Sequence, residues 1–269
     1  MLDHASFRAR FGEMPVFGMV HLLPLPGAPL FGGSIAAVID RAVVDAKAIA
    51  VGGAAGLVVE NFGDKPFGKK LQAETIAAMS RVIAEIAREV SIPFGVNALR
   101  SDGLAALAIA VATGASFIRI NVHTGAMLTD QGVIEGDAAA VLRRRRELGA
   151  DGVAIFADHM VKHAAPVAQL EPGQSAKDLR YRGLADAIIG SGAETGGEAD
   201  PNQFALLRAA VSDAPLIVGS GLTPANAKRY RGLIDGVIVG TSIKRGGEVA
   251  AEVDATRVRA VVNALKALR

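Results

Sequence analysis

Short runs of β-branched and aliphatic residues alternate with longer alanine-rich segments along the 269-residue chain, and no other feature restricts the fold as much. The short runs are largely apolar, as expected of strands that are buried on both faces of a parallel sheet. The longer segments have apolar residues at helical spacing and can connect parallel strands. The predicted strands begin at Val16, Gly56, Pro93, Phe117, Val153, Ala185, Leu216 and Gly236, and helical patterns cover 34–51, 71–90, 137–149 and 254–268.

Eight units of strand and helix match an α/β fold of the (β/α)8 type, the TIM barrel, which needs about 250 residues. A doubly wound open sheet is the alternative, because it uses the same alternation. No linker rich in Pro, Gly or Ser divides the chain, so we expect one barrel domain over 1–269. The glycine-rich fingerprints of dinucleotide and P-loop sites are missing, and no cofactor is predicted.

The composition excludes several classes of protein. The chain has no cysteine, which rules out disulfides, thiolate metal sites and a cysteine nucleophile, and a cytoplasmic location fits. The formal net charge of +2 predicts neither a nucleic acid nor a membrane as partner. The four arginines at 143–146 fall within a predicted helix and point around it, so they form no single basic face. The uncharged stretch 103–118 is too short for a membrane helix.

Two glycine-rich segments follow the last two predicted strands. In a (β/α)8 barrel these two loops lie side by side at the C-terminal face, where backbone N–H groups often bind phosphate. Glycines at these positions also serve simply to turn a strand into a helix, but the occurrence of both segments together favours an anion site. The predicted phosphate-binding residues are Gly219, Ser220, Gly221, Gly240, Thr241 and Ser242.

Polar residues end the first five predicted strands, and their side chains would meet at the mouth of the barrel. Carboxylate, amide and guanidinium groups in one place can orient a hydroxylated substrate and move protons. A structural role stays open for three of them: His21 as a hydrogen-bonded core residue, Asn97 as a loop tie, and Arg119 as an internal partner of Glu60. The candidates are Glu60 for catalysis, and His21, Asn61, Asn97, Arg119 and Asn121 for substrate binding.

Asp158 and Lys162 lie at the end of the fifth strand and in the loop that follows it. They can form an acid/base couple, with Asp158 transferring a proton and Lys162 as its charge partner or as an amine that engages a carbonyl. A structural ion pair explains the spacing equally well. His159 and His163 have a spacing that binds metals on helices, but no helix is predicted here, so no metal site is predicted.

Two longer connections also draw interest. The segment 161–183 is predicted to be irregular and is long enough to act as an active-site lid or a docking loop. The segment 191–201, "SGAETGGEADP", has the composition of a flexible binding loop, and Thr195 within it is a predicted substrate-binding residue.

Several stretches together resemble the BtpA family over nearly the whole chain, namely "FGMVHLLPLPGAPLFGG", "GLVVENFGDKPF", "GVNALRSD", "DHMVKHA" and "VGSGLTPANAKRYRGLIDGVIVGTSIK". The resemblance implies a barrel like those of the phosphate-binding superfamily. It also implies a link either to photosystem I accumulation or to sugar-related operons. The family's motif positions correspond to Pro24, Pro26, Asp64 and His163, together with the site candidates named above other than Thr195. Glu194 precedes the Thr-Gly step of this loop, which is a departure from the family's usual segment.

Two classes of function follow. One is an enzyme that acts on a phosphorylated sugar or nucleoside-like compound by acid/base chemistry, with lyase, isomerase and nucleosidase-like reactions all open. The other is a non-catalytic assembly factor, which would need no convergent polar set inside a barrel but would have an exposed apolar patch. The predicted ligand is a small phosphorylated anion, and a homo-oligomer is compatible with the sequence.

Overall fold

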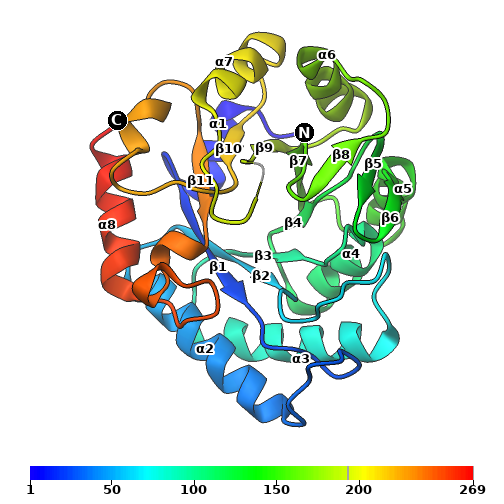
Figure 1. Cartoon of the computed structure of the whole chain (residues 1–269), viewed down its shortest axis with the longest axis vertical. Coiled ribbons are helices and arrows are strands. Elements are labelled where there is room, and N and C mark those ends of the chain that lie inside the picture. Colours follow the sequence, from blue (N-terminus) through cyan, green and yellow to red (C-terminus); the bar gives the residue numbers. More distant parts are fainter. Residues whose placement is uncertain (193, 269) are drawn as a thin grey trace.

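A closed barrel of eight parallel strands forms the centre of the molecule, as seen in a computed structural model that describes residues 1–192 and 194–268 (Figure 1). The order around the barrel is β1, β11, β10, β9, β7, β4, β3 and β2. This closure confirms the predicted (β/α)8 barrel and excludes the open sheet. The strands are β1 (Val16–His21), β2 (Gly56–Glu60), β3 (Phe94–Asn97), β4 (Phe117–Ile120), β7 (Ala154–His159), β9 (Ala187–Gly190), β10 (Leu216–Val218) and β11 (Gly236–Val239).

Helices surround the barrel, except that the first in the chain lies across its N-terminal end (Figure 1). They are α1 (His4–Phe11), α2 (Ile35–Val51), α3 (Ala73–Glu89), α4 (Gly103–Thr113), α5 (Ala138–Glu147), α6 (Pro172–Lys177), α7 (Pro201–Ala210) and α8 (Ala255–Lys266). A 3-10 turn at Ala227–Tyr230 stands between β10 and β11, in place of the helix predicted between the last two strands. Gly232, with a φ of 74°, soon turns the chain back toward β11.

Aromatic rings fill the lower part of the barrel. Phe117 stacks on Phe156 with ring centroids 4.4 Å apart, and Phe17 approaches Phe117 edge-on at 5.2 Å. Gly95 makes room for them, since a Cβ there would lie 2.2 Å from the ring of Phe117. From α1, Phe11 meets all three rings, at centroid distances of 5.4–5.8 Å. The N-terminal end of the barrel is therefore closed by apolar side chains, and the polar residues lie at the other end.

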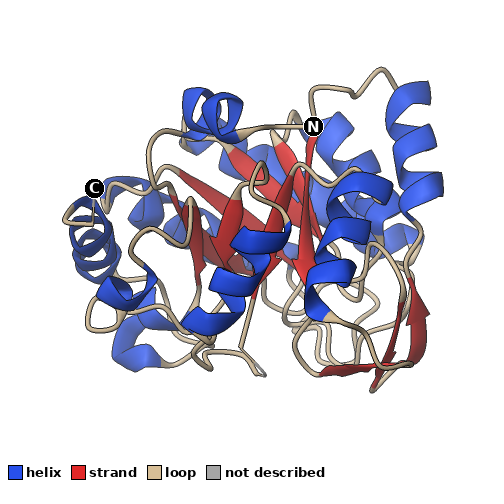
Figure 2. Cartoon of the chain, turned by 90° about the horizontal axis from the view of Figure 1, so that it is seen from above, coloured by secondary structure: helices blue, strands red, loops and turns tan. Residues whose placement is uncertain are grey.

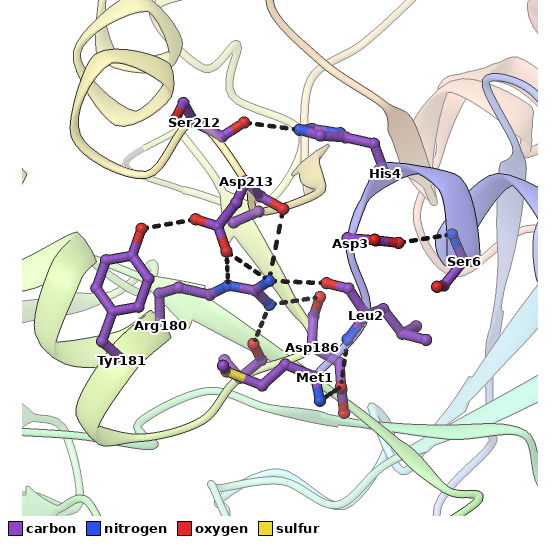
Figure 3. Close-up of polar contacts among 12 residues, drawn as sticks. Met1, Leu2, Asp3, His4, Ser6, Arg180, Tyr181, Asp186, Ser212 and Asp213 are labelled. Atoms are coloured by element: carbon purple, nitrogen blue, oxygen red, sulfur yellow. Dashed lines mark hydrogen bonds and ion pairs between the residues drawn. The ribbon is translucent and has the colours of Figure 1, made fainter.

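Polar contacts hold the segment before α1 against the barrel (Figure 3). The buried Arg180 donates to the carbonyl of Leu2 at 2.8 Å and pairs with Asp213 at 2.9 Å. The backbone N–H of Leu2 donates to Asp186 at 2.9 Å. These contacts fix the entry of α1 and thereby the position of its two phenylalanines under the barrel.

A small antiparallel sheet lies outside the barrel and was not predicted from the sequence. Its strands are β5 (Ala126–Thr129), β6 (Gly132–Glu135) and β8 (Ala164–Pro166), in the order β6, β5, β8, and Figure 2 shows them at the lower right. Met127, Ile134 and Val161 form a cluster on its inner side. The prediction of an irregular segment over 161–183 is therefore wrong: it contains β8, α6 and a π-helical turn at Asp178–Arg182.

Candidate active site

Four polar residues form one row across the C-terminal ends of adjacent strands. In the parallel registers, His21 on β1 pairs with Glu60 on β2, Glu60 with Asn97 on β3, and Asn97 with Arg119 on β4. Alternate residues of a barrel strand point inward, and Phe17 and Met19 precede His21 on the inner face just as Phe117 precedes Arg119. The same alternation that fills the lower barrel with apolar side chains thus brings this row into its mouth.

Arg119 and Asp158 form a buried, two-pronged ion pair. Nε and Nη2 of Arg119 each donate to one carboxylate oxygen of Asp158 at 3.0 Å, and the Asp158 side chain is fully buried. Asn121 adds a third donor to Asp158 at 2.7 Å. Arg119 therefore has Asp158 as its ion-pair partner, and not Glu60 as in the structural alternative left open by the sequence. Because both oxygens of Asp158 are engaged, the carboxylate holds Arg119 in place below the cavity.

Asn97 extends this network. Its amide nitrogen donates to the side-chain oxygen of Asn121 and to the backbone carbonyl of Arg119, both at 3.1 Å. Asn97 is fully buried. Asn121 contacts the cavity at the barrel mouth, and Asn97 orients it from below.

Glu60 and His21 lie side by side on the wall of the cavity. The His21 Nε2 is 3.8 Å from a Glu60 oxygen, and its ring stacks on Phe62 with centroids 4.4 Å apart. Burial raises the pKa of Glu60 above its ordinary value, although the nearby Arg119 opposes this. Burial lowers the pKa of His21 to about 3, so its imidazole is neutral at physiological pH. Glu60 is thus a carboxylate of this site that faces the cavity and whose pKa burial raises, a combination typical of catalytic acids and bases.

Lys162 lines both parts of the cavity. Burial, and secondarily the positive charge of Arg119, lowers its pKa to about 8. Among the residues that the structure describes, no carboxylate oxygen lies within 4.0 Å of its Nζ, so an ion pair with Asp158 is not formed. Pairing of β8 with β5 fixes the chain just after Lys162. The amine is thus held over the row of polar residues without a direct partner.

The two glycine-rich loops lie together at one side of the mouth and line a cavity of about 340 Å³. Gly221 has a φ of 69°, and a Cβ on it would lie 2.2 Å from the carbonyl oxygen of Gly197. The Ser220 hydroxyl accepts from the N–H of Gly192 at 2.9 Å and donates to the carbonyl of Gly197 at 3.0 Å. All six predicted phosphate-binding residues line this cavity. They are Gly219, Ser220 and Gly221 in the first loop, and Gly240, Thr241 and Ser242 in the second.

A second cavity of about 420 Å³ adjoins the first and shares Glu60, Phe62, Arg119, Lys162, Thr195, Thr241 and Gly247 with it. Thr195 accepts or donates a hydrogen bond with His163 at 3.2 Å, which ties the loop after β9 to the loop after β7. Ala193, within the predicted binding loop 191–201, lies outside the described residues. The two cavities together form one continuous groove across the mouth.

Asn61, a predicted substrate-binding residue, makes contacts between two loops. Asn61 donates to Asp64 at 3.0 Å and accepts from the N–H of Leu99 at 2.8 Å, joining the loops after β2 and β3. His159 is buried and meets the carbonyl of Pro172 at 3.1 Å, whereas His163 is exposed. Over 1–192 and 194–268, no three side chains of His, Asp and Glu come close enough to hold a metal ion.

Sequence reasoning missed four residues that line the groove. Phe62 and Arg100 follow the ends of β2 and β3, and Lys65 places its Nζ 4.1 Å from the centre of the Phe62 ring. Arg257 lies in the first turn of α8. Arg257 donates to the carbonyl of Ser242 at 3.3 Å. Phe62 lies two residues beyond the end of β2 and Arg100 three beyond the end of β3, so both could have been found by extending the search into each loop.

The fold and the site define a (β/α)8 barrel with a polar, basic groove at the C-terminal ends of its strands. The chain belongs to the BtpA family, which it matches over residues 12–267. It is 44% identical to the photosystem I biogenesis protein BtpA of Synechocystis over 93% of this chain and 88% of that protein. It is 42% identical to an uncharacterized protein of Pyrococcus abyssi over 96% and 98%.

Solved structures share the fold at low sequence identity. The native KDPGal structure superimposes with a TM-score of 0.58 at 14% identity, covering 95% of this chain and 96% of that one. N-(5'-phosphoribosyl)anthranilate isomerase from Pyrococcus furiosus gives a TM-score of 0.58 at 14% identity, covering 94% and 99%. Thiamine phosphate pyrophosphorylase from Pyrococcus furiosus gives 0.58 at 12%, covering 95% and 96%. Within the described residues, no helix has the length and apolar character needed to cross a membrane.

Proposed function

We propose that the protein is an enzyme that binds a phosphorylated, polyhydroxylated carbonyl compound and transfers a proton at the carbon next to the carbonyl group. One observation carries this proposal: a single groove joins the glycine-rich loops to Glu60 and Lys162. One end of the groove suits an anion, and the other has a carboxylate and an amine whose pKa values are both displaced toward neutrality.

The phosphate is assigned to the end formed by the loops after β10 and β11. Backbone N–H groups in such loops bind phosphate in barrels of this type. Gly221 allows the chain to pass close to Gly197, and the exposed Arg257 adds a positive charge beside Ser242. The names of two structural neighbours, a phosphoribosyl anthranilate isomerase and a thiamine phosphate pyrophosphorylase, support a phosphorylated ligand.

The chemistry is assigned to Glu60 and Lys162. Glu60 would remove the proton next to the carbonyl, so that the C–H bond breaks and its electron pair moves to the carbonyl oxygen. Lys162, protonated below a pKa of about 8, would donate a hydrogen bond to that oxygen, and the charge of Arg119 would stabilise it. Asp158, which the sequence suggested as the acid or base, then acts as a positioning residue for Arg119, because both of its oxygens accept from that guanidinium.

Replacement of Arg257 by Gln tests the phosphate end. We expect the variant to bind ribose 5-phosphate about tenfold more weakly than the wild type, because one charged donor to the phosphate is lost. Folding is expected to be unchanged, since Arg257 is exposed. Isothermal titration calorimetry measures the affinity. Arg259→Gln is the control, since this arginine lies on the same helix but donates to the carbonyl of Val51. Equal affinities in the wild type, Arg257→Gln and Arg259→Gln would show that the phosphate does not bind at Arg257.

A role in assembly is the second candidate, and an exposed apolar row on the small sheet favours it. Leu128 on β5 pairs with Val133 on β6, and the two side chains are 55% and 41% exposed. Val167, just after β8, is 58% exposed. Exposed apolar groups of this kind mark surfaces for partner proteins. The name of the Synechocystis relative, a photosystem I biogenesis protein, agrees with such a role.

The two candidates predict opposite results in a Synechocystis strain that lacks BtpA. If the protein is an enzyme, expression of the wild type or of Leu128→Asp should restore the photosystem I level, and expression of Lys162→Met should not. If the protein is an assembly factor, Lys162→Met should restore the level and Leu128→Asp should not, because an aspartate in the apolar row would disrupt the contact with the partner protein. Photosystem I is measured by its absorbance change at equal chlorophyll, with expression of each variant checked by immunoblotting.

A further inference from the structure

Arg100 is a buried cation without a carboxylate partner. It follows β3, is 7% exposed, and lines the second cavity. Its Nη2 donates to the carbonyl of Lys162 at 2.5 Å, and its Nε has no hydrogen-bond partner. In the described part of the chain, no carboxylate oxygen lies within 4.0 Å of its guanidinium, and burial lowers the pKa of Arg100.

Other deeply buried cations of this protein are paired. Arg119 meets Asp158 at 3.0 Å, Arg180 meets Asp213 at 2.9 Å, and Lys244 meets Asp45 at 2.9 Å. Burying a charge is costly unless an opposite charge compensates it. Arg100 has no carboxylate in direct contact, only the longer-range charges of Asp130, Asp158 and Glu60, and it faces a cavity, which is the arrangement expected where a ligand supplies the anion.

The surroundings of Arg100 strengthen the positive charge. The second cavity is lined by Lys65, Arg100, Arg119 and Lys162 against one carboxylate, Glu60, whose pKa is raised by burial. Arg119 is neutralised by Asp158 below, but Lys65, Arg100 and Lys162 have no carboxylate within 4.0 Å among residues 1–192 and 194–268. The second cavity therefore has a surplus of positive charge that one phosphate bound in the first cavity would not offset.

The barrel order places the glycine-rich loop of the first cavity and the Arg100 loop of the second cavity on opposite sides of the mouth. Going around the barrel, β10 and β3 are separated by three strands in either direction. The loop after β10 includes Gly219 to Gly221, and the loop after β3 includes Arg100. Glu60 and Lys162 line both cavities and so lie between the two ends. A ligand that fills the groove would have one end at each loop and its reacting carbon in the middle.

We propose that the substrate carries a second anionic group, a carboxylate or a second phosphate, which binds Arg100 and Lys65 across the barrel mouth from the first phosphate. This inference rests on the proposed function and narrows its substrate class to doubly anionic sugar derivatives. The guanidinium and the ammonium suit either anion, so the ligand panel has to separate the two.

Calorimetric titration with three probes tests the proposal: ribose 5-phosphate with one anionic group, ribulose 1,5-bisphosphate with two phosphates, and 6-phosphogluconate with a phosphate and a carboxylate. We expect at least one doubly anionic probe to bind ten or more times more tightly than ribose 5-phosphate. The probe that gains this advantage identifies the second group. If ribose 5-phosphate binds but neither doubly anionic probe binds more tightly, the second-anion site is refuted and the proposed function survives. If none of the three binds, both fail.

Two variants test whether the tighter binding of the doubly anionic probe depends on the second cavity. Arg100→Met should reduce the affinity ratio between the doubly anionic probe and ribose 5-phosphate to about one, with the affinity for ribose 5-phosphate kept within twofold. Lys65→Gln should lower the ratio about threefold, and because Lys65 is exposed it should not disturb folding. Lys69→Gln, also exposed and four residues away, is the matched control. A ratio unchanged in both Arg100→Met and Lys65→Gln would overturn the assignment.

Discussion

Replacement of Asp158 by Asn is expected to destabilise the protein by about 3–5 kcal/mol, the usual effect of removing one partner of a buried ion pair. The asparagine side chain is almost the same size, but it leaves the buried charge of Arg119 without its carboxylate. In the wild type, Arg119 and Asn121 donate to the two carboxylate oxygens of Asp158. In the variant, an NH2 group replaces one of these oxygens and cannot accept their hydrogen bonds. The free energy of unfolding is measured by urea denaturation, with circular dichroism as the readout.

The double variant Arg119→Met with Asp158→Asn is the control for this prediction. It removes both charges, so it should be clearly more stable than Asp158→Asn alone, although less active. If Asp158→Asn alone is as stable as the wild type and lowers only the turnover number, then Asp158 takes part in proton transfer and the positioning role is refuted.

Replacement of Lys162 by Met is expected to lower proton exchange at the carbon next to the carbonyl by about 10²–10⁴-fold, the range for loss of a positioned acid or base. The exchange is measured by proton NMR, as the loss of the corresponding substrate signal in D2O. The panel consists of phosphorylated ketoses and sugar acids, so the product need not be known. Near-normal exchange in Lys162→Met would remove this amine from the mechanism.

The dependence of this exchange on pH follows from the pKa of Lys162. The lowered value of about 8 means that the ammonium form predominates below pH 8 and is lost above it. If the ammonium donates to the carbonyl oxygen, kcat/KM should fall about tenfold per pH unit above pH 8. Lys162→Arg should keep its charge throughout this range and therefore lose the alkaline limb. A rate that instead rises through pH 8, with borohydride trapping of the substrate, would indicate that the neutral amine forms a Schiff base.

The barrel could be predicted because its signal is local. Each strand is a short apolar run, and the polar residues at the strand ends, such as Glu60 and Arg119, follow directly from that frame. The row from His21 to Arg119 is a consequence of inward alternation and of the parallel register, both of which are general properties of barrels.

The partners of these residues could not be predicted, because they depend on distances between units far apart in the chain. Arg119 had two carboxylates within reach of the mouth, and only the folded barrel shows that it pairs with Asp158 and leaves Glu60 facing the cavity. The small sheet was missed for a similar reason. β8 has three residues, too few for a sequence pattern, and it exists because β5 offers it an edge.

The pairing of β5 with β8 has a consequence for protein engineering. Loops at the top of a (β/α)8 barrel are commonly treated as separate modules that can be exchanged one at a time. In this protein the loop after β7, which presents Lys162, is fastened by a strand that belongs to the loop after β4. Grafting either loop alone into another barrel would leave an unpaired edge and an unanchored lysine. The two loops therefore form a single transferable unit, and only their joint transplantation should carry the amine to its place over a new barrel.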